Sequence, residues 1–385
     1  MARRVTLRAM FRRLLIAALF ASSVAAQTPA APPLQTHQVN PDNTITFRYL
    51  NKGAKKVTVS IDAPDNLLPM TVDDNGVWSV TTPKLAPEYY GYAFVVDGLT
   101  TLDPNNADVR RNYIYFANNV LVPGQPAQPW ELTDIPHGRV DHRYFATHVG
   151  KNFPSNQGAY VVYTPPGYDA KRKGGYPVLY LLHGYSDDET GWEQVGHTSL
   201  ILDSLIAQQK AVPMLVVMPL GYGNLDFVTS HDKVWSDPAR VEENVSLYSS
   251  ILLSEVLPAV EREYNAARDR NSRAIAGLSM GGLESLYTGL NHTDKFAYII
   301  GMSSAADQRN FGEHMPDLDA KKADLKLLWV ACGTDDALLK PNREFIAWAK
   351  TKSLPVTAVE TPGRHTWVVW RDNLINVAPL LFRSK

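Results

Sequence analysis

Two different patterns of hydrophobic and polar positions divide the chain. From Val39 to Val122, short segments alternate apolar and polar residues, and turn-forming residues such as Asn51-Lys52-Gly53 and Asp97-Gly98 separate them. The predicted strands are Thr44–Tyr49, Lys56–Ile61, Gly76–Val80 and Tyr89–Val96. Short strands spaced at near-regular intervals by turn signals are typical of an all-β sandwich. We therefore predict a small all-β sandwich over residues 39–122.

The second pattern begins at about Gly138, after a proline-rich stretch from Val122 to Pro129 that suits a domain boundary. The predicted strands are Tyr144–His148, Ala159–Tyr163, Val178–Leu182, Met214–Met218, Arg273–Ala276, Tyr298–Met302, Lys326–Ala331 and Val356–Val359. The predicted helices are Leu247–Tyr264, Leu283–Leu290, Arg343–Thr351 and Leu374–Phe382. Apolar strands that alternate with helices predict an α/β domain over residues 138–385, in which helices cover both faces of a mostly parallel sheet.

The N-terminus has the pattern of an export signal. An arginine-rich start is followed by the apolar run Leu14–Phe20 and by small residues that end at Ala26. The apolar run is too short to span a bilayer, which needs about 20 residues, so we expect cleavage after Ala26. An uncleaved anchor is the alternative. The predicted location is secreted or periplasmic, with no membrane association once residues 1–26 are removed.

Charge and composition narrow the function classes. Five of the 38 Lys and Arg residues fall in the predicted signal, and the remainder is outnumbered by 39 Asp and Glu. A mildly acidic chain without a basic block is a poor nucleic-acid binder. The single cysteine, Cys332, cannot form an internal disulfide. No zinc-ligand spacing or phosphate loop is apparent, and the acidic run Asp187–Glu189 is interpreted as solvated surface. We expect no metal and no cofactor, and the oligomeric state stays open.

The pentapeptide Gly277–Gly281 contains a candidate nucleophile, Ser279. It follows the apolar run Ala274–Ala276 and precedes the helical segment Leu283–Leu290. A Gly-x-Ser-x-Gly sequence between a strand and a helix is typical of a sharp turn that exposes the serine hydroxyl at the end of a sheet.

A serine hydroxyl needs a base, and the base needs an orienting carboxylate. The nucleophile, the acid and the histidine follow one another in that order in α/β-hydrolases. His365 lies in a loop after the last predicted strand, which makes it the candidate base. Asp335 and Asp336 lie at the end of the preceding strand, and the pattern favours neither of them as the acid.

The oxyanion that forms on an ester carbonyl needs two N–H donors. The amide of Met280, directly after the nucleophile, is one candidate. The second is expected in the loop after an early strand, where His183-Gly184-Tyr185 follows an apolar run. His183 precedes the tight turn, so we expect it to have a structural hydrogen-bonding role.

Four motifs carry a family resemblance. They are LLHGYSDDETGW (181–192), GLSMGG (277–282), CGTDD (332–336) and PGRHTWVVWR (362–371). Together they resemble the esterase D-type branch of the α/β-hydrolases, which includes the feruloyl and acetyl-xylan esterases of carbohydrate esterase family one. The resemblance extends from about Gly138 to the C-terminus.

The resemblance implies particular roles. It assigns the nucleophile to Ser279, the base to His365, the acid to Asp336 and the second oxyanion amide to Tyr185. One position departs from the family pattern, because Arg364 stands where relatives usually carry glycine before the histidine.

The sandwich region carries a second resemblance. The segment Tyr89–Arg110 is similar to immunoglobulin-like N-terminal modules of polysaccharide-degrading enzymes, which are related to glycogen-binding domains. Trp78, Tyr89, Tyr90 and Tyr92 would stack on sugar rings if they were exposed. The alternative, which we favour, is that they form the sandwich core or the contact between domains.

Aromatic residues near the predicted site suggest the substrate. The residues expected to line a substrate pocket are Gly184, Tyr222, Phe227, Trp235 and Trp367. An aromatic lining suits a planar feruloyl group, another aryl ester or a sugar. We therefore expect a secreted serine carboxylesterase that removes feruloyl or acetyl groups from plant cell-wall polysaccharide, so the expected partner is a polysaccharide- or oligosaccharide-linked ester. The alternatives are a hydrolase of a siderophore or other small ester, and a non-catalytic carbohydrate-binding protein.

Overall fold

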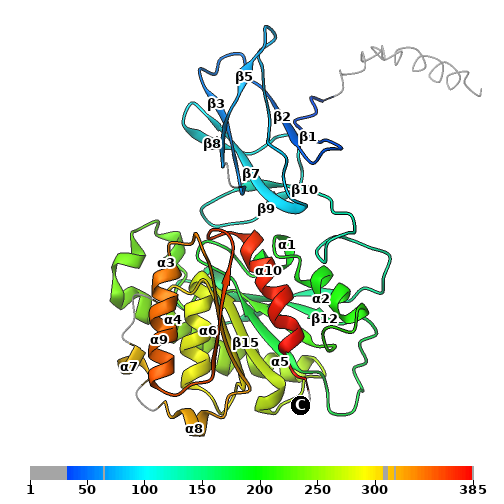
Figure 1. Ribbon diagram of the computed structural model, residues 1–385. Coiled ribbons are helices and arrows are strands. Elements are labelled where there is room, and N and C mark those ends of the chain that lie inside the picture. Colours follow the sequence, from blue (N-terminus) through cyan, green and yellow to red (C-terminus); the bar gives the residue numbers. More distant parts are fainter. Residues whose placement is uncertain (1–32, 64–65, 307–310, 316–317, 384–385) are drawn as a thin grey trace, which may run out of the picture. The chain divides into compact units, whose positions relative to one another are not determined.

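The N-terminal part of the protein is built from two sheets of antiparallel strands (Figure 1). The computed structural model describes residues 33–63, 66–306, 311–315 and 318–383. The predicted signal, residues 1–26, lies outside the described residues. Within the described ranges, no helix is both long enough and apolar enough to cross a membrane. Residues Gln35–Lys385 form one compact unit.

The sandwich contains the four predicted strands and several others that were not predicted. The first sheet has the order β1 (His37–Val39), β2 (Ile45–Leu50), β6 (Val77–Thr81), β5 (Thr71–Val72). The second has the order β4 (Leu67–Pro69), β3 (Val57–Ile61), β7 (Glu88–Val96), β10 (Ala117–Val122), β9 (Val109–Arg110), and β8 (Leu99–Thr101) also pairs with β7. The all-β prediction for this region is therefore confirmed.

The core of the sandwich lies between its two sheets. Phe47 and Phe94 have no exposed surface, and Trp78, Tyr90 and Tyr92 are buried with them. Polar tips of the aromatic side chains are hydrogen-bonded, as buried aromatic donors usually are; for example, the Trp78 indole N–H donates to the Asn51 carbonyl at 2.9 Å. Three of the four aromatics considered as sugar-stacking residues are thus core residues.

The C-terminal part is built on an eight-stranded sheet. Its order is β11 (Arg139–Ala146), β12 (Gln157–Thr164), β14 (Leu215–Pro219), β13 (Val178–Leu182), β15 (Arg273–Leu278), β16 (Tyr298–Met302), β17 (Leu327–Gly333), β18 (Val356–Thr361). The β11–β12 and β12–β14 pairs are antiparallel and all the others are parallel. The predicted mostly parallel sheet is confirmed. Because neighbouring parallel strands end at one edge, the loops after β13, β15 and β17 meet there.

Helices cover both faces of this sheet (Figure 1). The α-helices are α1 (Gly191–Gln194), α2 (Thr198–Ala207), α3 (Asp226–Thr229), α4 (Pro238–Ile251), α5 (Leu257–Glu263), α6 (Ser279–Asn291), α7 (Phe311–His314), α8 (Ala320–Ala323), α9 (Leu339–Thr351) and α10 (Trp367–Val377). A π-helical turn, Leu252–Val256, joins α4 to α5, and short 3-10 turns lie at Pro154–Asn156, Val234–Ser236, Arg270–Ser272 and Ala378–Leu380. Residues of α2 and α10 pack on one face, and residues of α4, α5, α6 and α9 pack on the other.

All four predicted helices begin earlier in the structure, α6 at Ser279 and α9 at Leu339, and the other two differ most. The helix predicted to begin at Leu247 begins at Pro238, because the Asp237 side chain accepts hydrogen bonds from two free N–H groups of the first turn. The helix predicted over Leu374–Phe382 is wrong in position: α10 begins at Trp367 and ends at Val377. Its start lies directly after the His365 loop, so it anchors that loop to the sheet.

Candidate active site

Ser279 lies at a strained turn between β15 and α6. Its φ angle is +53°, in the left-handed region that costs a non-glycine residue about 1–3 kcal/mol. A Cβ atom on Gly277 would lie 2.2 Å from the Gly281 carbonyl oxygen, and one on Gly281 would lie 2.4 Å from the His183 carbonyl oxygen. Both glycines are therefore required by close backbone contacts. The turn holds the Ser279 hydroxyl at the edge of the sheet.

A chain of hydrogen bonds connects Ser279 to a buried carboxylate. The Ser279 Oγ lies 3.0 Å from His365 Nε2, and His365 Nδ1 lies 2.8 Å from Asp336 Oδ2. The Asp336 side chain has no exposed surface, whereas the His365 side chain is 36% exposed. An ionised carboxylate only accepts hydrogen bonds, so Nδ1 carries the imidazole proton and Nε2 is free to accept the serine proton.

The two adjacent aspartates have different environments. Asp336 is buried and accepts a second hydrogen bond, from the Leu338 N–H at 2.8 Å, on Oδ1. Burial alone would raise the pKa of Asp336, but the hydrogen bond and charge of His365 outweigh burial and lower the pKa below its ordinary value. The Asp335 side chain is exposed, and its backbone N–H donates to the Gly363 carbonyl at 2.9 Å. The choice that the sequence pattern left open is thus decided in geometry: Asp336 contacts the histidine.

Two residues beside Asp336 were not identified from the sequence. Ser303 hydrogen-bonds the Asp336 carboxylate, and it accepts a hydrogen bond from the Trp370 indole N–H at 3.2 Å. The Trp370 ring lies edge-on to His365 with centroids 4.9 Å apart. A polar residue directly after the β16 strand was the available signal for Ser303, because strand ends in a parallel sheet face the site.

Cys332 lies beside the same carboxylate. Burial, reinforced by the Asp336 charge, raises the pKa of its thiol to about 12. The thiol is therefore neutral near pH 7, and Cys332 acts as a small buried side chain rather than a nucleophile.

The loop after β13 lies against the nucleophile. A Cβ atom on Gly184 would lie 2.6 Å from Leu278 Cδ1 and 3.3 Å from Ser279 Cβ, so only glycine lets the loop approach this closely. The Gly281 N–H donates to the His183 carbonyl at 3.1 Å and joins this loop to α6. Met280 is in the first turn of α6, where backbone N–H groups have no partner inside the helix.

His183 supports the loop from within the fold. It is 1% exposed, its Nε2 accepts from the Gly221 N–H at 2.8 Å, and its Nδ1 lies 2.8 Å from the Gly184 carbonyl oxygen. These two partners fix the neutral tautomer that carries its proton on Nδ1. This arrangement agrees with a structural role for His183.

The predicted pocket residues do not all line a pocket. Tyr222 has no exposed surface, and Phe227 and Trp367 are each 2% exposed, so the prediction that these three side chains line a substrate pocket is wrong. Tyr222 instead accepts a hydrogen bond from the Ser186 N–H at 2.8 Å, and Trp367 packs edge-on against Trp192.

A half-buried aromatic group remains next to the site. Tyr185 and Trp235 are half-buried, and each contacts Phe227 edge-on, with centroids 5.8 and 5.3 Å apart. The three side chains belong to the same hydrophobic cluster as Met280, the residue after Ser279. Tyr185 and Trp235 provide a partly exposed aromatic surface in this cluster, whereas Phe227 is buried.

The acidic run after Tyr185 is not solvated surface. Asp187, Asp188 and Glu189 are 2%, 5% and 6% exposed, and each faces a cationic or imidazole group. The partners are Arg110 at 2.7 Å, Arg111 at 3.3 Å and His142 at 2.9 Å, respectively. Our interpretation of this run was wrong because its partners come from segments far away in the sequence. Among the described residues, no group of three or more His, Cys, Asp or Glu side chains is arranged to hold a metal ion.

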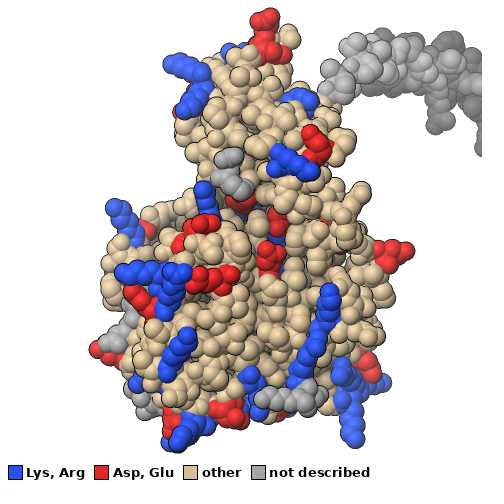
Figure 2. Space-filling view, in the orientation of Figure 1, with Lys and Arg blue, Asp and Glu red and all other residues tan. Residues whose placement is uncertain are grey.

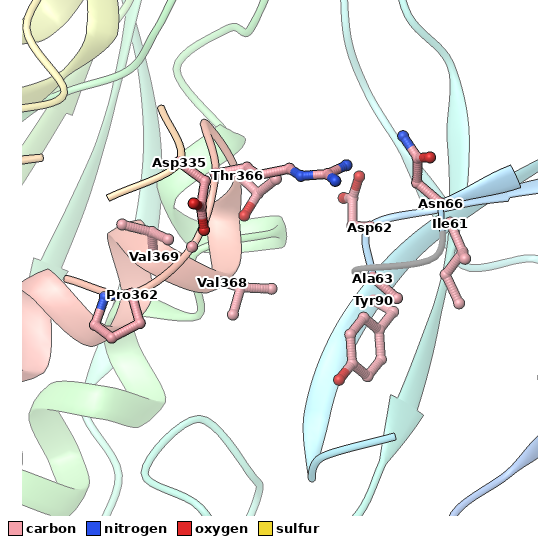
Figure 3. A pocket seen from close by; sticks show the side chains of 12 residues that line it. Ile61, Asp62, Ala63, Asn66, Tyr90, Asp335, Pro362, Thr366, Val368 and Val369 are labelled. Atoms are coloured by element: carbon pink, nitrogen blue, oxygen red, sulfur yellow. The ribbon is translucent and has the colours of Figure 1, made fainter. Parts of the chain in front are cut away.

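Arg364 lines a pocket of about 860 Å³ beside the His365 loop. The sandwich contributes Asp62, Asn66 and Tyr90 to its wall, and Asp335 and Thr366 lie across from them (Figure 3). Asp335, the exposed aspartate of the pair, thus lines this pocket, whereas Asp336 points to the histidine.

On the face shown in Figure 2, Lys and Arg side chains are interspersed with Asp and Glu.

Comparison with known proteins identifies two regions. Residues 156–381 match the Esterase family, and residues 33–106 match carbohydrate-binding module 48, the isoamylase N-terminal domain. An endo-1,4-beta-xylanase/feruloyl esterase of Xylanibacter ruminicola is 29% identical over 362 residues, which is 91% of this chain and 46% of that protein. The chain therefore spans less than half the length of this relative.

Solved structures resemble the chain as well. A ferulic acid esterase superposes with a TM-score of 0.51 at 27% identity and covers 63% of this chain and 97% of its own. The enterobactin esterase of Shigella flexneri superposes with a TM-score of 0.64 at 18% identity and covers 89% of this chain and 94% of its own. At that identity, the second comparison shows a shared fold over both regions.

Proposed function

Since the chain belongs to the Esterase family, we propose that it is a carboxylic-ester hydrolase, specifically a serine esterase which removes feruloyl or acetyl groups from plant cell-wall polysaccharide. One observation carries this proposal. The Ser279 hydroxyl, the His365 imidazole and the Asp336 carboxylate form one hydrogen-bonded chain, with distances of 3.0 and 2.8 Å. This arrangement provides a nucleophile, a base and an orienting carboxylate.

In the first half-reaction, Ser279 Oγ attacks the ester carbonyl carbon while its proton moves to His365 Nε2. The imidazolium that forms is stabilised by Asp336, which is already ionised because its pKa is lowered. When the tetrahedral intermediate collapses, the bond to the alcohol oxygen breaks and His365 returns its proton to that oxygen. The alcohol leaves, and the acyl group stays on Ser279.

Water completes the cycle by the same route. His365 takes a proton from a water molecule, the resulting hydroxide equivalent attacks the acyl carbonyl, and the bond to Ser279 Oγ breaks. The proton returns to Ser279 and the carboxylic acid leaves. The N–H groups of Met280 and Tyr185 stabilise the oxyanion in both halves, and each such donor contributes about 10²–10³ in kcat.

The acyl specificity rests on the aromatic surface beside the nucleophile. Tyr185 and Trp235, the half-buried members of this group, contact each other edge-on with centroids 5.7 Å apart, and offset or edge contacts with a planar ring are favourable by about 0.5–1.5 kcal/mol. A feruloyl ring fits such a surface. The names of the relatives point the same way, since one is described as a xylanase/feruloyl esterase and another as a ferulic acid esterase.

The proposal includes export to the outside of the cytoplasm, where polysaccharide is found, because residues 1–26 have the pattern of an export signal. Expression of the full chain in a bacterial host, followed by mass determination of the exported protein, tests this part. A mature N-terminus at Gln27 supports export and cleavage, whereas retention of residues 1–26 in a membrane fraction contradicts them.

A comparison of substrates tests the chemical class. Methyl ferulate, acetylated xylan and a cyclic catecholate ester are assayed side by side with wild type and Ser279→Ala. The proposal expects methyl ferulate or acetylated xylan to be the best substrate and Ser279→Ala to be inactive on all three.

Two outcomes distinguish the alternatives. A preference for the catecholate ester would favour a siderophore esterase, the class of the Shigella flexneri structure that shares this fold over both regions. Rates for wild type and Ser279→Ala that both equal the uncatalysed background would favour a non-catalytic carbohydrate-binding protein, whereas equal rates above it would contradict the serine mechanism.

A further inference from the structure

We propose that the β9–β10 loop of the N-terminal sandwich positions the oxyanion loop, so that Arg110 and Asn112 are positioning residues for ester hydrolysis. The inference rests on the proposed function, because it assumes that the Tyr185 N–H is an oxyanion donor. It assigns the sandwich a role in turnover of small esters, which requires no carbohydrate binding.

The contacts converge on one carboxylate. Arg110, the last residue of β9, donates from a terminal guanidinium nitrogen to Asp187 Oδ1 at 2.7 Å. The Asn112 side-chain amide donates to the same oxygen at 2.7 Å. Asp187 is two residues after Tyr185, and its side chain is 3% exposed. A buried carboxylate held by two donors leaves the backbone around it little freedom.

A backbone contact joins the two loops one residue further along. The Tyr113 N–H donates to the Ser186 carbonyl at 2.7 Å. Ser186 has a φ angle of +74°, a conformation that a non-glycine residue keeps only when its surroundings impose it. On its other side, the Ser186 N–H donates to the Tyr222 hydroxyl at 2.8 Å, and the Tyr222 ring packs edge-on against Tyr113. Both the N–H and the carbonyl of Ser186 are therefore held by hydrogen bonds.

The β9–β10 loop is itself rigid where it makes these contacts. The Asn112 side-chain oxygen accepts from the Ile114 and Tyr115 N–H groups at 2.9 and 2.8 Å. One side chain thus closes its own turn with its oxygen and holds Asp187 with its nitrogen. Asn112 is 6% exposed, so water does not compete freely for either contact.

The consequence for catalysis follows from the length of the loop. Only Gly184 separates His183, which is bonded to the start of α6, from Tyr185, and Ser186 follows directly. The Tyr185 amide is consequently held between an anchor on the hydrolase domain and an anchor on the sandwich. Since an oxyanion donor acts only when it is preorganised, loosening the second anchor lowers kcat without changing ground-state binding of a small ester.

The test uses the full chain and an isosteric substitution. Asn112→Asp keeps the oxygen that closes the turn but replaces the donor to Asp187 with a second carboxylate oxygen. We expect kcat for p-nitrophenyl acetate to fall by about 10- to 100-fold with KM changed less than about threefold, as for partial loss of one oxyanion donor. Inhibition by phenylboronic acid, which forms a tetrahedral adduct at the serine, is expected to weaken in parallel.

A second variant keeps the test decisive if the first folds poorly. In Arg110→Gln, the other donor to Asp187 Oδ1 loses its charge, while the Asn112 side chain still closes its own turn. We expect kcat for p-nitrophenyl acetate to fall by about 10-fold with KM changed less than about threefold, on the scale of partial loss of one oxyanion donor.

Glu261→Gln serves as the matched control, because it removes the half-buried carboxylate that pairs with the buried Arg273, at the end of β15 away from Ser279. Its kcat is expected to stay within about twofold of wild type.

Three outcomes overturn the proposal: an unchanged kcat in folded Asn112→Asp, an unchanged kcat in folded Arg110→Gln, or an equal loss of kcat in Glu261→Gln. These results are distinguishable from failure of the proposed function, which appears separately as residual activity of Ser279→Ala.

Discussion

Replacing Asp336 by asparagine changes one atom and is expected to reverse the hydrogen bonding of the whole catalytic chain. The Leu338 N–H donates to Asp336 Oδ1 at 2.8 Å, so an asparagine at this position keeps its carbonyl oxygen on that side. Its amide nitrogen then faces His365 Nδ1, where Asp336 Oδ2 now lies at 2.8 Å. Because an amide nitrogen only donates, Nδ1 must become the acceptor and the ring proton moves to Nε2.

The expected loss in kcat follows from this change of tautomer. Nε2, which lies 3.0 Å from the Ser279 hydroxyl, can no longer accept the serine proton. The corresponding substitution in a serine protease triad lowers kcat by about 10⁴-fold, which is about 5.5 kcal/mol at 1.36 kcal/mol for each factor of ten. Geometry and volume are preserved, so we expect a loss of about 10³–10⁴ in kcat with little change in KM.

The neighbouring residue provides the matched control. Asp335→Asn makes the same chemical change on an exposed side chain that lines the pocket beside the histidine loop. Steady-state kinetics with p-nitrophenyl acetate are expected to show less than about a threefold loss, since surface substitutions away from buried contacts have small effects. A larger loss in Asp335→Asn than in Asp336→Asn would refute the reasoning, and so would a loss below tenfold in Asp336→Asn.

Three further predictions concern the scaffold. In Gly281→Ala, the new methyl group meets the His183 carbonyl at 2.4 Å, so we expect loss of activity and lower thermal stability by circular dichroism; an active, equally stable variant would contradict the tight turn. Burial raises the pKa of Glu284 well above its ordinary value. The folded state therefore retains a proton that the unfolded state loses, so the free energy of unfolding falls as pH rises, by up to about 1.4 kcal/mol per pH unit. Urea unfolding at increasing pH above about 5 should show stability falling more steeply in wild type than in Glu284→Gln. Glu88→Ala leaves the fully buried Arg371 guanidinium without its carboxylate at 2.8 Å, and we expect a loss of about 3–5 kcal/mol in urea unfolding; an unchanged midpoint would show that the pair is dispensable.

Local sequence patterns predicted much of the fold. The strands Val178–Leu182 and Tyr298–Met302 begin and end where the apolar runs do, because buried parallel strands are apolar on both faces. Strand β10 was not predicted, since its second and third residues are Asn118 and Asn119. Those side chains are buried and hydrogen-bonded to the segment around Asp103–Asp108. Because these hydrogen bonds come from another loop, the sequence of the strand itself shows no alternation of apolar and polar residues that would predict it.

The same distinction applies to the candidate site: residues in local motifs were predicted, whereas contacts between distant segments were not. Ser279 and His365 lie in local motifs with a distinctive order, and the structure brings them within 3.0 Å. The pocket lining was misjudged at Tyr222, because aromatic character does not indicate which side of a loop a residue faces. The pairing of Asp187 with Arg110 joins positions 77 residues apart and could not be read from either segment alone.

Rapid-quench mass spectrometry of the protein mixed with p-nitrophenyl acetate tests the central claim most directly. We predict that a single acetyl group is found on the peptide containing Ser279 during the first turnovers, and that Ser279→Ala shows neither the adduct nor the burst of nitrophenol. An acetyl group on another residue such as Ser303, or full turnover by Ser279→Ala, would contradict the account.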